Sequence, residues 1–263
     1  MKFNPTGRAR LSALLALCLF VPRLCAQVVL DLGQAAQWDL DNRQGFGNVS
    51  CTNITLPPAG AYALDILQRE GVVANLLYRF NELNYRWVAQ DTYTFSARFN
   101  LAADSDLLRA RSCQQLRFDT LDTAACLSLN GAPLGCAANA HRPHAFNVTG
   151  ALAAGLNLLA VTIQSAAGYA AGQAGAYPYA VPAVQQPGSI PHFNFIRKPA
   201  SDLGWDWGPA FAPSGLSGVK LRGFSSPFLT GQFAADFLET SQWLSGGPGL
   251  PCVLCRAARG AGA

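Results

Sequence analysis

One hexapeptide combines residues that suit sugar binding: Gly204–Pro209, which reads Gly-Trp-Asp-Trp-Gly-Pro. Two indoles flank one carboxylate. Burying all three together would be costly, because the carboxylate would lose its hydration and each indole N–H would need a partner. On a loop at the edge of a pocket, an indole can lie against the C–H face of a hexose while Asp206 accepts hydrogen bonds from adjacent hydroxyls. The alternative is an aromatic plug in a tight turn between two strands.

The segments before this hexapeptide predict an all-β scaffold. Residues 92–101 alternate strictly between apolar and polar side chains, as in a half-buried antiparallel strand. Residues 127–134 predict a hairpin around Asn130-Gly131, the pair that a type I′ turn favours. Shorter alternating runs follow at 116–118, 146–148, 159–163 and 219–222. Short strands separated by turns are typical of a β-sandwich or jelly roll.

Three other segments carry further structural expectations. Residues 28–41 predict a first strand with Trp38 as a core anchor. Residues 61–70 predict a short helix ended by Gly71, because their apolar residues recur at helical spacing. Residues 166–190 are rich in Ala, Gly, Tyr, Pro and Gln and almost free of charge, so we interpret them as a long loop.

The composition indicates a folded, exported protein. Of 263 residues, half are apolar and 13% are charged. The first 26 residues contain a basic start and an apolar run from Leu11 to Val21, which predicts a secretory signal peptide too short to span a bilayer. Without this segment the chain has 15 basic and 15 acidic residues, so no nucleic-acid partner is expected, and no membrane association after signal removal.

Cysteines and sequons agree with export. Six cysteines remain after residue 26, an even number that allows up to three disulfides: Cys51, Cys113, Cys126, Cys136, Cys252 and Cys255. Cys126 and Cys136 flank the predicted hairpin and either pair across it or are kept apart by the strand direction. The sequons at Asn48, Asn53 and Asn147 predict N-glycosylation.

Several blocks resemble β-mannosidases of glycoside hydrolase family two. Residues 193–199 (Phe-Asn-Phe-Ile-Arg-Lys-Pro) precede the Trp-Asp-Trp hexapeptide, and residues 78–87 read Tyr-Arg-Phe-Asn-Glu-Leu-Asn-Tyr-Arg-Trp. Residues 119–123 with 127–131 form a weaker block that recurs in sandwich domains of the family. The blocks stand in the family's order and cover roughly Trp38 to Phe224.

The resemblance implies an N-terminal jelly-roll β-sandwich of the galactose-binding-like type. In such enzymes the Trp-Asp-Trp loop reaches into the active site of a neighbouring (β/α)₈ barrel and holds the terminal mannose. By position this assigns substrate binding to Trp205, Asp206 and Trp207, with a β-mannoside or mannose-containing oligosaccharide as partner. The two catalytic glutamates belong to the barrel, and we expect this chain to end before them.

The residues themselves agree that cleavage chemistry is missing. After residue 26 the glutamates are Glu70, Glu82 and Glu239. A retaining glycosidase needs two carboxyls about 5 to 5.5 Å apart, and a barrel alone needs about 250 residues. A hydrolase built from Glu82 and Asp206 is a minor alternative. His141 and His144 lack further ligands nearby, so no metal and no cofactor is expected.

For the block at 78–87 we favour a structural corner in which Arg79 or Arg86 pairs with Glu82. The predicted division is a signal peptide at 1–26, a β-sandwich at 27–225 and a linker-like, disordered tail at 226–263. The expected location is the secretory pathway, ending outside the cell or in a lysosome or vacuole.

Three functions follow from these observations. The leading one is the N-terminal part of a β-mannosidase, inactive and with weak or undetectable sugar affinity by itself. The second is a free-standing, secreted lectin-like module. The third is a structural sandwich in which the Trp-Asp-Trp loop merely plugs a turn.

Overall fold

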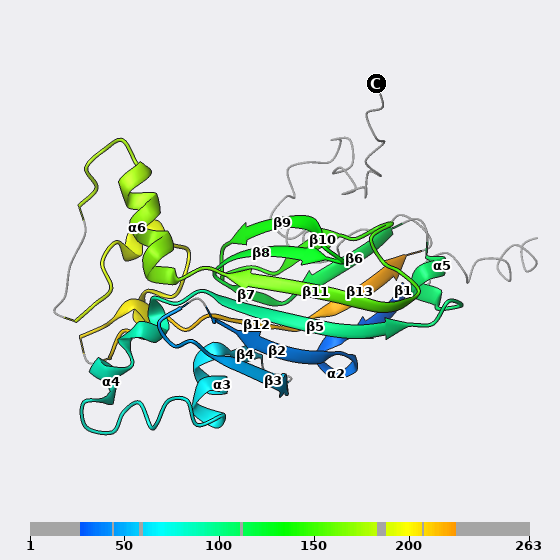
Figure 1. Cartoon of the computed structure of the whole chain (residues 1–263). Helices are drawn as coiled ribbons and strands as arrows, with labels where there is room; N and C mark the ends of the chain where they lie inside the picture. The colour runs from blue at the N-terminus through cyan, green and yellow to red at the C-terminus, as the bar shows by residue number, and fades with distance from the viewer. Residues whose placement is uncertain are drawn as a thin grey trace, which may run out of the picture.

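The computed structural model describes residues 27–43, 45–57, 60–110, 113–182, 188–206 and 208–224. The chain there is mostly β-strand, arranged in antiparallel sheets with a few short helices (Figure 1). The expected signal peptide at 1–26 and tail at 226–263 lie outside the described residues. None of the described helices combines the length and apolar character needed to cross a bilayer.

The larger sheet has six strands and contains the most regular pairing. Its order is β3 (Ser50–Ile54), β2 (Gln37–Asp41), β5 (Tyr93–Leu101), β11 (Gly155–Ile163), β8 (Ala124–Leu129) and β9 (Ala132–Ala138). Strand β5 pairs with β11 from Tyr93 opposite Ile163 to Leu101 opposite Gly155. The odd-numbered residues of β5 are buried, as the alternating sequence predicts.

A four-stranded sheet lies opposite and closes the core. Its order is β1 (Gln27–Asp31), β13 (Lys220–Phe224), β6 (Cys113–Phe118) and β10 (His144–Asn147). Phe118 and Leu221 from this sheet share one buried cluster with Trp38 and Phe95 from the larger sheet. Two sheets that bury their facing sides in a common core form a β-sandwich.

A small third sheet pairs three short strands from distant parts of the chain. It consists of β4 (Ala61–Tyr62), β12 (Gly215–Ser217) and β7 (Thr120–Asp122). Helix α3 (Ala63–Arg69) follows β4 directly, within the segment where the sequence predicts a short helix. Gly71 just beyond it has a φ of 73°, a left-handed conformation that suits glycine at a helix end.

The single first strand expected at 28–41 is wrong, because the segment contains two strands in different sheets. Helix α2 (Leu32–Ala35) separates β1 from β2. The carboxylate of Asp31 accepts a hydrogen bond from the backbone N–H of Gly33 at 2.9 Å and caps this turn. The indole N–H of Trp38 donates to the carbonyl of Leu32 at 2.8 Å, so the buried indole also stabilises the turn between β1 and β2.

The long loop expected at 166–190 is also wrong over its first half, which forms helix α6 (Ala166–Ala176). The hydroxyl of Ser165 accepts a hydrogen bond from the backbone N–H of Gly168 at 2.9 Å and starts the helix. Alanine has the highest intrinsic helix propensity, and Ala166 and Ala170 are buried in a second, smaller cluster. Packing of small side chains therefore stabilises a helix whose sequence lacks a broad apolar stripe.

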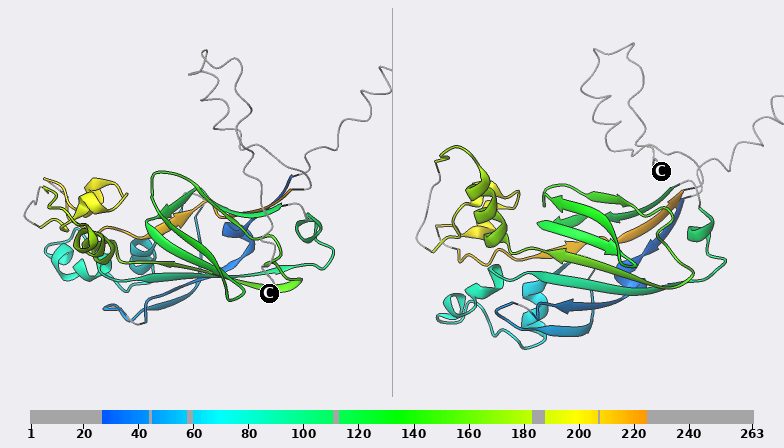
Figure 2. Two further views of the ribbon diagram at one scale, coloured as in Figure 1. Left: turned by 90° about the horizontal axis from the view of Figure 1, so that it is seen from above. Right: turned by 45° about the horizontal axis from the view of Figure 1, so that its top comes forward.

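The helical segments other than α2, α3 and α5 gather at one end of the sheets. There α6 lies near η2 (Phe193–Phe195) and η3 (Ala200–Leu203), with α4 (Asn81–Asn84) and η1 (Arg86–Ala89) beside them (Figures 1 and 2). Helix α5 (Asp106–Arg109) lies at the opposite end. Both sequence blocks specific to the family resemblance therefore lie at the same end of the sandwich.

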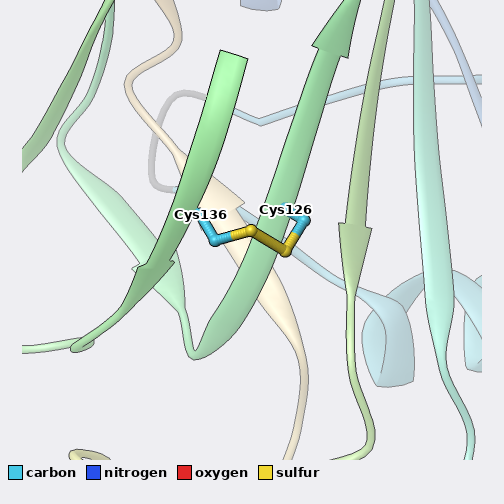
Figure 3. Close-up of a disulfide and its surroundings, with 2 residues drawn as sticks. All are labelled: Cys126 and Cys136. Atoms are coloured by element: carbon cyan, nitrogen blue, oxygen red, sulfur yellow. A yellow bond between two sulfur atoms is a disulfide. The ribbon is translucent and has the colours of Figure 1, made fainter. Parts of the chain in front are cut away.

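The hairpin of β8 and β9 carries a disulfide. Asn130 and Gly131 have positive φ angles of 52° and 82°, which confirms the expected turn. Cys126 and Cys136 are directly opposite each other in the register and form a disulfide bond (Figure 3). Of the two alternatives that the sequence leaves open, the structure has the paired one. Cys51 is a buried free thiol, and desolvation by burial raises its pKa.

We expect the Cys126→Ser/Cys136→Ser variant to unfold more easily than the wild type. The cross-link closes a short loop, so its loss should lower the free energy of unfolding by about 2 to 3 kcal/mol. Urea denaturation followed by tryptophan fluorescence measures this difference. Thr52→Ser, at an exposed position on the opposite edge of the sheet, should change the stability by no more than about 0.5 kcal/mol. Equal midpoints for both variants would contradict the expectation.

Candidate functional site

A pocket of about 470 Å³ lies where two distant parts of the chain meet at the helical end of the sandwich. Residues between Leu77 and Arg86 line one wall, and Trp205, Asp206 and residues 208–210 line the other. Gly188 and Ser189 complete the lining. The volume is within the range of small-molecule sites. The two sequence blocks that stand far apart in the chain therefore form one concave surface.

Trp205 and Asp206 both line this pocket. Trp205 is 46% exposed, and Asp206 is exposed as well. Trp207 lies outside the described residues. The backbone of Trp205 and that of Gly208 exchange two hydrogen bonds of 3.2 Å, which makes the turn tight. An indole that is exposed beside a pocket does not plug a turn, so the geometry disfavours the purely structural interpretation of this loop.

The loop turns at Gly204, where only glycine fits. Its φ of 114° is in a region that residues with a side chain rarely adopt. A Cβ at this position would also approach the Cα of Ser189 to 2.8 Å. The backbone N–H of Ile190 donates to the carbonyl of Leu203 at 2.7 Å and holds the two segments together. This close contact positions Trp205 and Asp206 beside Ser189 in the pocket lining.

A buried lysine anchors the segment that leads into the loop. The side chain of Lys198 is 1% exposed, and its ammonium lies 2.7 Å from an oxygen of Asp122, 3.0 Å from one of Asp202 and 2.7 Å from the carbonyl of Pro213. Three acceptors match the three donors of an ammonium group. Nearby, burial raises the pKa of Tyr62, and the carboxylates of Asp122 and Asp202 raise it further.

Lys198 and Asp122 have no role that the sequence alone predicts. The available signal was a lysine inside the mostly apolar block at 193–199 and an aspartate inside the block at 119–123. Both blocks contribute to the family resemblance. The residues around Lys198 do not show that its partner is Asp122, and the residues around Asp122 do not show that its partner is Lys198. The ion pair connects residues 76 positions apart, which is a tertiary contact.

A small apolar cluster packs beneath the segments on either side of the Trp205 loop. Ile196, Leu203 and Ala212 are buried in it together with Ala170 of α6, and Phe193 packs against it. The backbone N–H of Ala212 donates to the carbonyl of Asp202 at 2.7 Å. These contacts connect η2, η3 and α6, so the loop is built on packed elements although it is exposed itself.

The opposite wall differs from the structural corner that we expected. Arg79 lies over the ring of Tyr78, 5.2 Å from its centroid. Within the described part of the chain, no ion pair or hydrogen bond engages the side chains of Glu82 or Arg86. The expected pairing of Arg79 or Arg86 with Glu82 is therefore not formed, and these charged groups face the pocket instead.

The remaining candidate residues lie elsewhere. Asn48, Asn53 and Asn147 are all exposed, and their glycosylation stays a prediction. Glu70 follows α3, 3.4 Å from the guanidinium of Arg69, and Glu239 is outside the described residues. Among the described residues, no group of three or more His, Cys, Asp and Glu side chains is arranged to hold a metal ion.

Comparisons with known proteins give consistent relatives. Residues 40–218 match the family described as glycosyl hydrolase 2 galactose-binding domain-like. The β-mannosidase of Rattus norvegicus is 33% identical over 79% of this chain and 23% of its own length. β-Mannosidase A of Aspergillus aculeatus is 32% identical over 78% of this chain and 21% of its own length.

A solved structure shows the same relationship. The β-D-mannosidase from Dictyoglomus thermophilum has a TM-score of 0.61 and 26% identity, over 75% of this chain and 22% of its own. The present chain thus spans less than a quarter of the relatives that it matches here.

Replacing Lys198 with methionine should destabilise the protein strongly. The change leaves Asp122, whose side chain is 4% exposed, as a buried carboxylate without its cation, at an expected cost of about 3 to 5 kcal/mol. Urea denaturation measures the loss. Lys220→Met is the matched control, because Lys220 lies 3.4 Å from Asp119 at the surface and such pairs contribute at most about 1 kcal/mol. Similar effects of the two substitutions would refute the anchoring role.

Proposed function

The chain belongs to the glycosyl hydrolase 2 galactose-binding domain-like family, and on this basis we propose that it is the sugar-holding part of a β-mannosidase. In this role it binds the terminal β-linked mannose of a mannoside or mannose-containing oligosaccharide. A catalytic (β/α)₈ barrel elsewhere in the protein cleaves the bond. The much greater length of the matched β-mannosidases supports this division of labour.

The observation that carries the proposal is the exposure of Trp205 and Asp206 together in a concave, solvent-facing pocket. The indole offers an apolar face for the C–H groups of a sugar ring. The carboxylate accepts hydrogen bonds from two adjacent hydroxyls, and a charged acceptor strengthens these bonds. A site that bonds a particular hydroxyl discriminates against sugars in which that hydroxyl is misplaced. In this proposal the side chain of Trp207 also binds the sugar.

Exposed apolar side chains beside the pocket support a neighbouring domain. Leu77 is 76% exposed and Phe80 is 72% exposed, and both belong to the segment that forms one wall. Large apolar side chains gathered at a pocket rim are typical of interaction surfaces. A catalytic domain seated on this rim would cover them and complete the enclosure of the sugar.

A free-standing lectin-like module is the second candidate. The pocket that residues of this domain line among themselves favours it. The two candidates differ in the expected affinity. A β-mannosidase part forms only one side of the sugar site, so by itself it should bind a monosaccharide only in the millimolar range. An affinity in the low micromolar range would favour the lectin-like module.

The proposal also includes a secretory location, a jelly-roll strand order and the glycans at Asn48, Asn53 and Asn147. The predicted signal segment supports export to the cell exterior, a lysosome or a vacuole. The disulfide between Cys126 and Cys136 supports an oxidising compartment.

Asp206→Asn should weaken binding of methyl β-D-mannoside by about tenfold or more. The substitution keeps the shape of the side chain and removes the charge, and hydrogen bonds to charged groups contribute about 1.5 to 3 kcal/mol. Nuclear magnetic resonance titration of the chain with the glycoside measures the dissociation constant. Asp104→Asn, an exposed aspartate in the turn after β5, should bind like the wild type. Unchanged affinity of Asp206→Asn would remove the basis of the proposal.

The purified 263-residue chain should not hydrolyse an aryl β-mannoside. The pocket contains the carboxylates of Glu82 and Asp206, so the Glu82→Gln/Asp206→Asn variant is the matched control. Release of the aryl group should be the same for wild type, variant and buffer. Robust turnover that the double variant abolishes would instead show an independent hydrolase.

A further inference from the structure

The wall formed by α4 and η1 carries charged side chains that have no role in the proposed binding of a sugar by Trp205 and Asp206. Glu82 lies in α4, and Arg86 begins η1 four residues later. Both side chains line the same pocket as Asp206. Opposite charges at this spacing on a helical segment usually attract each other. Here no ion pair or hydrogen bond of either side chain is formed within the described residues, so their polar atoms face the pocket unsatisfied by the protein.

The position of Arg86 shows that its guanidinium reaches the segment beside the Trp205 loop. A Cβ at Gly188 would lie 3.4 Å from Nη2 of Arg86. Gly188 has a φ of 82°, and Ser189 next to it contacts Gly204 closely. The guanidinium therefore lies beside Gly188, which lines the same pocket as Trp205 and Asp206.

The charges around the pocket fit a neutral polyol. Two carboxylates, Glu82 and Asp206, and two guanidiniums, Arg79 and Arg86, line it, so their formal charges cancel. A sugar hydroxyl donates one hydrogen bond and accepts others, and it can bridge a carboxylate acceptor and a guanidinium donor. An added carboxylate on the sugar would lie near two like charges as well as the arginines.

We infer that Glu82 and Arg86 are specificity-determining residues that bind a second set of hydroxyls on the sugar held by Trp205 and Asp206. This inference rests on the proposed function of the loop. Glu82 accepts hydrogen bonds from the sugar and repels an anionic ring substituent, while Arg86 donates hydrogen bonds to the same ring. Glu82 thereby favours a neutral hexoside over the uronate of the same configuration, while Arg86 contributes to the binding of both.

The test compares two probes that differ only at the sixth carbon, methyl β-D-mannoside and its uronate, in magnetic resonance titrations of the full chain. Glu82→Gln should weaken binding of the mannoside by about tenfold and narrow the preference for the mannoside over the uronate. Arg86→Gln should weaken binding of both probes. A purely structural role would not change the preference between the probes. Both side chains are solvent-accessible, and thermal unfolding of each variant verifies that it folds.

Arg109→Gln is the matched control, because Arg109 is an exposed arginine in α5 at the far end of the sandwich. It should bind both probes like the wild type. If Asp206→Asn loses the mannoside while Glu82→Gln and Arg86→Gln keep wild-type affinity and preference, the inference is wrong and the proposed function stands. If the wild type shows no shift up to about 100 mM mannoside, enough to saturate a millimolar site, the isolated chain does not hold the sugar and the inference is wrong, while a β-mannosidase part with undetectable affinity by itself is still consistent with the result.

Discussion

The position of the loop that carries Trp205 and Asp206 depends on one buried cation. The ammonium of Lys198 joins Asp122 at the end of β7, Asp202 in η3 and the carbonyl of Pro213, which precedes β12. A buried ammonium is tolerated when its three donors are satisfied, and removal of one partner leaves an uncompensated charge. Because the three acceptors come from separate segments, the ammonium can be satisfied only when these segments are assembled. The loop that presents Trp205 and Asp206 follows immediately after η3, so this assembly also positions the loop.

The rest of the site adds rigidity around that anchor. The apolar cluster around Leu203 connects α6 with η2 and η3, and Gly204 permits a contact with Ser189 that no larger residue allows. None of the lining residues in the described part of the chain belongs to a strand. The sheets instead support the helices and loops that carry these residues. This division is common in proteins in which a rigid scaffold carries binding residues on loops. The segments α4, α6, η1, η2 and η3, which gather at one end of the sheets, carry or support the lining of the pocket.

The two walls of the pocket have different chemistry. One offers an exposed indole and a carboxylate, and the other offers a carboxylate and guanidiniums with apolar side chains at the rim. An apolar face combined with charged acceptors and donors matches a ligand that has C–H faces and many hydroxyls. The β-mannosidases that match this chain are more than four times as long as the region that they share with it.

Local patterns in the sequence were sufficient for the regular parts of the fold. Alternation over residues 92–101 predicts β5, the run at 159–163 predicts the second part of β11, and Asn130-Gly131 predicts the hairpin, because these signals depend only on neighbouring residues. The cost of burying Asp206 between two indoles likewise predicts an exposed loop. The local patterns failed where packing decides: an alanine-rich stretch became helix α6 against a small cluster, and an apparent single strand was divided by a capped turn.

Only the tertiary structure decided which charged residues meet. The sequence does not show that Lys198 lies against Asp122, nor that Glu82 and Arg86 share a pocket with Asp206 instead of pairing with each other. These relations depend on how the sheets bring distant segments together, and that is set by the burial of a common core and not by any local spacing. The chain by itself therefore determined its strands and its aromatic, acidic loop, and the packed fold determined what faces that loop.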